Sequence, residues 1–189
     1  MRAYSPSEWK TLRLSGTITV DGDVIDWETV RLEGVHHVVH EYANFVSSAE
    51  MVITGAHNGK GFDPPINTHL SHAFLLNARK MADFFGGRSV HSKPDDVFAE
   101  DYAPGPDAPL RTWPDWRDPI NKQLTHITYT RGAAPQEIPR QAILDIYREL
   151  KSAWKEFRAP GKLRNAFAVK FEHEITDKLT TEFNGLDLW

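Results

Sequence analysis

The sequence predicts an all-α fold, an up-and-down bundle of four to five helices with room for a short N-terminal β-hairpin. Two observations lead to this prediction. Apolar residues recur at spacings of three and four over several long segments, as they do on the buried face of a helix. These segments do not alternate with strands in βαβ units, so helices packed on helices are the arrangement that remains.

The composition is that of one globular domain. The chain has 189 residues, 40% of them apolar, with six tryptophans, which is enough to bury a sizeable core. We expect a single domain over residues 1–189, with an N-terminal hairpin or extension at 1–26 and a C-terminal segment of ambiguous structure at 162–189. The chain has no cysteine, which excludes disulfides, thiolate metal sites and thiol nucleophiles.

We expect a cytoplasmic protein with no membrane partner. The first residues lack the apolar core of a signal peptide, and no apolar run approaches the length that spans a membrane. The net charge of −4 gives the whole molecule no attraction to nucleic acid, so RNA binding would require a local basic patch.

The N-terminal segment reads as two short strands, residues 17–20 and 24–25, joined by a turn. The turn contains an Asp-Gly pair, which strongly favours a hairpin. From Asp26 to about His57 the period becomes helical, and we expect one face to be buried: Val35, Val38, Val39, Tyr42, Phe45, Val46, Ala49, Val52 and Ile53.

A second helix is expected from about Asn67 to Phe85. It is apolar on nearly all sides, as is typical of a central helix, and His72, Arg79 and Asp83 are polar exceptions on one ridge. An unpaired buried charge is very costly, so we expect Arg79 to pair with a carboxylate, and Asp83 and Asp96 are the candidates.

The second half of the chain contains a short helix at 94–102 and a proline-rich loop at 103–117 that should bury Trp113 and Trp116. Asp118-Pro119 reads as the N-cap and first residue of a helix that ends at Gly132. A further helix is expected at 134–158. Residues 162–189 fit a helix, because apolar residues recur every four, although 166–171 could equally form a strand.

The helix at 118–132 carries Asn121, Lys122 and His126, and a histidine among β-branched residues in mid-helix calls for an explanation. In one interpretation Arg79 belongs to a buried ion pair and His126 is structural. In the other, both line a cleft in which His126 acts as acid or base while Arg79 or Lys122 holds an anion. The sequence leaves both interpretations open.

Histidines offer a third interpretation, a metal site. His36 and His40 are one helical turn apart, and His69 and His72 are three residues apart. The helical phase argues against it, because it turns His37 and His40 to solvent and His36 to the flank. Phosphate loops, dinucleotide fingerprints and nucleophile elbows are missing from the sequence, so we predict no cofactor and no metal.

Three blocks, residues 74–85, 95–102 and 120–131, together resemble a family of uncharacterised bacterial proteins over roughly residues 66–132. More remotely, a helical bundle with polar residues on a late helix is similar to HEPN domains. Many of these are RNA-cleaving toxins or phage-defence nucleases, with an arginine four to six residues before a histidine. Here Arg117 precedes His126 by nine positions, with Asn121 and Lys122 in the interval.

The HEPN resemblance implies a metal-independent ribonuclease in which His126 is similar to the catalytic histidine, with Asn121 and Lys122 beside it. An alternative from another class is a non-catalytic helical module that forms a homodimer or binds a protein partner. Its support is the tryptophan content, which exceeds what one small core usually holds. Convergence of Arg79 and His126 in an open cleft would favour the ribonuclease, and burial of Arg79 in a closed pair would favour the module.

Overall fold

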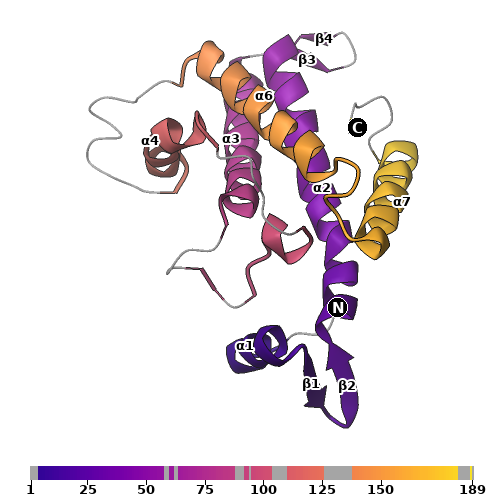
Figure 1. The fold of residues 1–189 in the computed structure, drawn as a ribbon. Helices are drawn as coiled ribbons and strands as arrows, with labels where there is room; N and C mark the ends of the chain where they lie inside the picture. Colours follow the sequence, from indigo (N-terminus) through magenta and orange to yellow (C-terminus); the bar gives the residue numbers. More distant parts are fainter. Residues whose placement is uncertain are drawn as a thin grey trace.

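The fold is an all-α bundle, as the sequence predicts. A computed structural model of the chain describes residues 4–57, 60–61, 64–87, 92–93, 95–103, 110–125, 138–182 and 188. Within this part of the chain four long helices pack together: α2 (Trp27–Thr54), α3 (Pro64–Gly86), α6 (Arg140–Phe157) and α7 (Asn165–Thr181). Helix α2 runs through the middle, with α3 on one side and α7 on the other, and α6 crosses in front of it (Figure 1).

Helix α2 is long because its apolar stripe continues over its whole length and both ends are capped. The Asp26 carboxylate accepts a hydrogen bond from the Thr29 N–H at 2.8 Å, and Gly55 ends the helix with φ 64°. The predicted stripe is confirmed from Val35 to Ala49, whose apolar members are buried, while Val52 and Ile53 are partly buried.

The core is dominated by aromatic side chains from α2, α3, α6 and α7. Tyr42 stacks on Trp154 with ring centroids 4.0 Å apart and an interplanar angle of 12°, and both side chains are fully buried. Trp154 also meets Phe171 edge to face at 5.9 Å. Phe171 belongs to the four-residue stripe of α7, so the helical interpretation of this segment is correct for residues 165–181.

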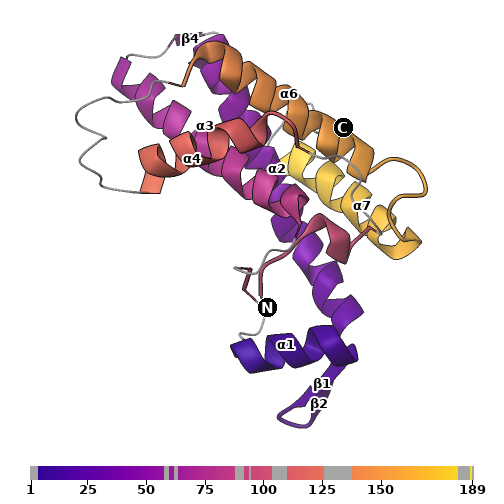
Figure 2. The same cartoon turned by 60° about the vertical axis from the view of Figure 1, so that its left-hand side comes forward.

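The N-terminal hairpin is present as β1 (Thr17–Val20) and β2 (Asp23–Asp26), paired antiparallel. It is preceded by a helix that the sequence analysis missed, α1 (Pro6–Ser15). Helix α1 and the hairpin project from the first turns of α2 at one end of the bundle (Figures 1 and 2). A second short ladder, β3 (Ala56–His57) with β4 (Lys60–Gly61), follows α2.

The region between α3 and α6 differs from the prediction. The helix expected at 94–102 is only a 3₁₀ turn, η1 (Ala99–Asp101). Helix α4 spans Trp113–Thr125, so it begins five residues before Asp118, and Pro119 lies inside it. The helix expected from 134 begins at Arg140. The predicted helix end at 126–132 lies outside the described residues.

Helix α4 begins early because another helix caps it. The Glu149 side chain of α6 accepts hydrogen bonds from the backbone N–H groups of Arg111, Thr112 and Trp113, the last two at 2.8 and 3.0 Å. These N–H groups would otherwise lack partners at a helix start, and a carboxylate also suits the positive end of the helix dipole. Asp118 is therefore not the N-cap that the sequence suggested.

Candidate functional site: the cleft between α3 and α4

An open cleft of about 600 Å³ lies between the C-terminal half of α3, the segment at 92–98 and the first turns of α4. Helix α4 lies beside α3 in the structure (Figure 2). The charged residues that line the cleft are Arg79 and Lys80 on α3, Arg117 on α4, and two carboxylates, Asp83 and Asp96. The cleft thus brings together cations from two helices.

The ion pair predicted for Arg79 is present. Its Nε atom lies 3.7 Å from Oδ2 of Asp83, one turn later on α3. The side chains are 34% and 52% exposed, so the interpretation of a buried, closed pair is wrong. An exposed pair of this kind stabilises a fold by about 0–1 kcal/mol. Asp96, the other candidate partner, instead accepts a hydrogen bond from the Lys93 N–H at 2.6 Å.

Asp83 is the residue of the cleft whose pKa is shifted by the surrounding charges and by burial. Partial burial raises the pKa of Asp83 above its ordinary value, the charges of Arg79 and Arg117 oppose this rise, and Asp96 adds to it. Arg117 therefore acts on the same carboxylate that Arg79 contacts. The two guanidinium groups share this cleft although they lie on different helices.

Three residues of α4 line the cleft: Trp113, Pro114 and Arg117. Trp113, Arg117 and Asn121 follow each other at intervals of four, which places them on one face of the helix. Trp113 is buried against the core, Arg117 is exposed and Asn121 is half-buried. Because the sequence analysis began this helix at 118, it separated Arg117 from the ridge and missed it as a site residue.

Two of the predicted site residues are not placed. His126 directly follows Thr125, the last described residue of α4, and so lies outside the described residues. Lys122 belongs to α4, but its side chain is also outside the described part. The structure therefore brings Arg79 to a shared cleft with Arg117 and puts Asn121 on the ridge of Arg117, and His126 stays a prediction.

Two histidines of α2, His36 and His40, pair with carboxylates at α7 and its C-cap. His36 Nδ1 lies 3.0 Å from Glu174 Oε2, and His40 Nδ1 lies 3.7 Å from Glu182 Oε2. His37 is exposed as expected, whereas His40 is half-buried. Among the residues that the structure describes, no group of three or more His, Asp or Glu side chains could hold a metal ion.

His69 is exposed and His72 is half-buried on α3.

No described helix is both long and apolar enough to cross a membrane. No family model, curated protein or solved structure matches the chain. The case for a function therefore comes from the chemistry of the cleft. The guanidinium groups of Arg79 and Arg117 lie near the Asp83 carboxylate, whose ion pair with Arg79 is partly exposed, and such groups are suited to binding an anion.

Proposed function

We propose that the protein binds RNA in the cleft between α3 and α4 and cleaves it without a metal ion, with His126 as acid or base. The observation that supports this proposal is the position of Arg79 and Arg117, which line one open cleft from two helices. Guanidinium groups bind phosphate oxygens through two parallel hydrogen bonds, and their charge persists at every physiological pH.

The exposure of the Arg79–Asp83 pair favours this function over a purely structural one. A buried pair would hold Arg79 in place, because separating it would leave an uncompensated charge in the core. The pair observed here is about a third to a half exposed, so water can compensate both groups when they separate. Arg79 can therefore exchange Asp83 for a phosphate at small cost.

In the proposed chemistry His126, which follows Thr125 in the sequence, transfers the proton. A neutral His126 would remove the proton from a ribose 2′-hydroxyl, whose oxygen then attacks the adjacent phosphorus while the 5′-oxygen leaves and takes up a proton. Acid–base assistance of this kind contributes ~10²–10⁴-fold. Arg79 and Arg117 would neutralise the charge on the non-bridging oxygens, and Asn121 would hydrogen-bond the substrate beside them. The positive charge of Lys122 would favour the neutral form of His126.

The competing proposal is a non-catalytic module that forms a homodimer or binds a partner protein. Among the residues that the structure describes, the large apolar side chains that are exposed lie on different elements: Leu14 on α1, Val24 on β2, Leu76 on α3, Val97 before η1, and Val169 on α7. A scattered distribution of this kind gives a partner no shared apolar face. The cleft is the more specific feature, so we favour RNA.

Binding of a fluorescently labelled single-stranded RNA, measured by anisotropy at several salt concentrations, tests the proposal. We expect Arg79→Ala and Arg117→Ala each to weaken binding and to reduce the slope of log Kd against log salt by roughly 0.7. Arg148→Ala is the matched control, because Arg148 is 68% exposed on α6 and does not line the cleft. Equal affinity for all three variants would contradict the proposal.

A further inference from the structure

A second pocket, of about 360 Å³, lies between α1, the N-terminal half of α2, α3 and the segment at 95–102. It shares a wall with the α3–α4 cleft through Lys80, Phe84 and Val97, but opens between different elements. Pockets of small-molecule size in proteins are about 300–1,000 Å³, mainly apolar, with a few polar groups that orient the ligand. This pocket has that character, with most of its polar groups at its two ends and His37 between them.

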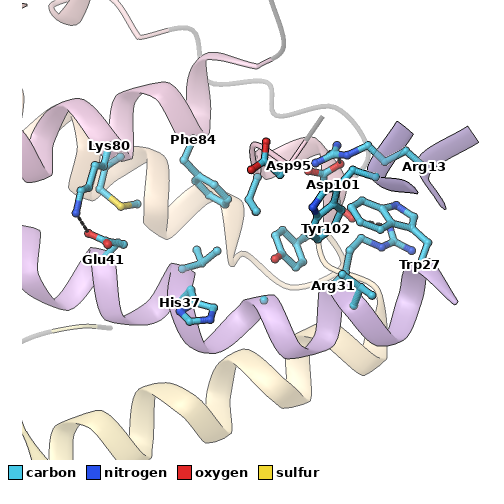
Figure 3. A pocket seen from close by; sticks show the side chains of 16 residues that line it. Arg13, Trp27, Arg31, His37, Glu41, Lys80, Phe84, Asp95, Asp101 and Tyr102 are labelled. Atoms are coloured by element: carbon cyan, nitrogen blue, oxygen red, sulfur yellow. Dashed lines mark hydrogen bonds and ion pairs between the residues drawn. The ribbon is translucent and has the colours of Figure 1, made fainter. Parts of the chain in front are cut away.

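One end of the pocket is rich in cations and aromatic rings. Figure 3 shows Arg13, Trp27, Arg31, Asp101 and Tyr102 gathered there. The guanidinium carbons of Arg13 and Arg31 lie 4.7 and 5.5 Å from the centre of the Trp27 ring. Contacts of this length are cation–π interactions, and they hold the two arginines in fixed positions.

The two arginines differ in how their charge is compensated. Arg13 forms an ion pair with the Asp101 carboxylate, Nη1 to Oδ1, at 3.1 Å. Arg31 donates from Nη1 to the backbone oxygen of Asp101 at 2.6 Å, so its partner there is neutral. The Nε–H groups of both arginines are buried without a hydrogen-bond acceptor among the described residues. Asp95 also lines this end, so two carboxylates accompany the two guanidinium groups. Arg31 is the one of the two arginines that has no carboxylate within ion-pair distance among the described residues.

A further cation, Arg164, acts on Arg31. Burial lowers the pKa of Arg31, and the charge of Arg164, which begins the segment leading into α7, lowers it further. Asp101 and Glu28 oppose this shift. An acidic ligand group that reached Arg31 would relieve the repulsion between the two cations.

The rest of the pocket is mainly apolar, and an ion pair without net charge lies at its other end. Val30, Val38, Met81 and Phe84 form its walls, and all four are buried. At the far end the Lys80 Nζ lies 2.7 Å from Glu41 Oε2, so these charges compensate each other. Gly34 lines the pocket where a Cβ atom would come within 2.8 Å of the Tyr102 hydroxyl. Any larger residue there would push the ring of Tyr102 away.

We propose that this pocket binds a planar aromatic molecule with a single acidic group, with the acidic group at Arg31 and the ring system among Phe84, Tyr102 and the apolar walls. An acidic group would compensate the charge of Arg31, whose hydrogen-bond acceptor in the structure is a neutral carbonyl oxygen. A flat ring fills the apolar space between the two ends and contacts aromatic rings along it. The site is independent of the proposed RNA cleft.

The test compares two probes of the same shape, 2-naphthoate and 2-naphthamide, by isothermal titration calorimetry on the full chain. A hydrogen bond to a charged group is worth enough to predict that naphthoate binds about tenfold to a hundredfold more tightly than the neutral amide. Equal affinity, tighter binding of the amide, or no heat of binding from naphthoate would overturn the proposal. This comparison requires no mutation and so carries no risk of unfolding.

Variants then locate the site. Arg31→Met keeps the length of the side chain and removes its charge, and we expect it to abolish the preference for naphthoate over naphthamide. His37→Trp places a bulky ring on an exposed α2 residue at the pocket, and we expect it to weaken both probes. His173→Trp is its matched control, on the exposed face of α7 and outside the pocket lining. Unchanged preference in Arg31→Met, or equal losses in the two histidine variants, would overturn the assignment.

Discussion

Glu149 on α6 holds the start of α4 through the backbone N–H of Trp113, at 3.0 Å from its Oε2 atom. The same carboxylate accepts the Thr112 N–H at 2.8 Å. Arg117 follows Trp113 by four residues on the same face of α4. The cap therefore determines where the helix begins and, through its register, places the Arg117 guanidinium in the cleft opposite Arg79.

Replacing this cap should weaken both the fold and the site. We expect Glu149→Ala to lower the free energy of unfolding by about 1–2 kcal/mol, the usual cost of losing an N-cap, measured by urea denaturation. RNA binding should weaken as well, because Arg117 loses its fixed position. Glu156→Ala, on an exposed residue of the same helix, serves as control. An unchanged midpoint for Glu149→Ala would show that the cap does not stabilise α4.

Removing Arg79 should leave the fold almost intact. Because its pair with Asp83 is half-exposed, we expect Arg79→Ala to change the free energy of unfolding by no more than about 1 kcal/mol. Chemical denaturation measures this change. A buried pair would give a loss of about 3–5 kcal/mol, and a loss of that size would return Arg79 to a structural role.

Asp83 should make stability depend on pH. Because its pKa is raised, the folded state binds this proton more tightly than the unfolded state does. The contribution of Asp83 to stability therefore decreases as pH rises from the ordinary aspartate pKa through the raised value. Asp83→Asn should remove this decrease, as measured by urea unfolding between about pH 4 and 7. The effect should be small because the side chain is half-exposed, and an identical pH profile for the variant would contradict it.

The same carboxylate should oppose RNA binding. Protonation removes a negative charge from beside Arg79 and Arg117, so we expect the wild type to bind RNA more tightly as pH falls through the raised pKa of Asp83. Asp83→Asn should bind tightly at every pH in that interval. Weaker binding by this variant than by the wild type would show that Asp83 does not compete with phosphate.

Val39 tests the phase of α2. Its side chain is fully buried in the core, so Val39→Asp places a charge there without a partner and should destabilise the domain by about 4 kcal/mol or more. Val169→Asp is the control, since Val169 is 69% exposed on α7. Thermal melting followed by circular dichroism separates the two, and equal melting temperatures would contradict the buried face assigned to α2.

The sequence predicted well where local pattern decides the structure. The stripe of α2 and the Asp21-Gly22 turn depend on residues close together in the chain. The start of α4 depends on Glu149, which lies 36 residues after Trp113, and no local signal marks it. Helix α1 was missed for another reason. Its capping box at Ser5 and Glu8 is visible in the sequence, but Leu12 is its single buried residue, so the apolar period is weak.

The sequence predicted one part of the candidate site, the ion pair on α3, and left out another, Arg117 on α4. The pairing of Arg79 with Asp83 follows from their spacing of four on one helix. Their exposure could not be predicted, because apolar neighbours on all sides of α3 suggested burial. Arg117 could be recognised only once α4 was known to begin at Trp113.

Cleavage of a single-stranded RNA in the presence of a metal chelator is the most direct test of the proposed function. We expect the wild type to cut the RNA and His126→Ala to lose cleavage while keeping nearly the same melting temperature, because only the proton-transfer group is removed. If the wild type leaves the RNA intact and His126→Ala lowers the melting temperature, His126 is a structural residue and the protein is not a ribonuclease.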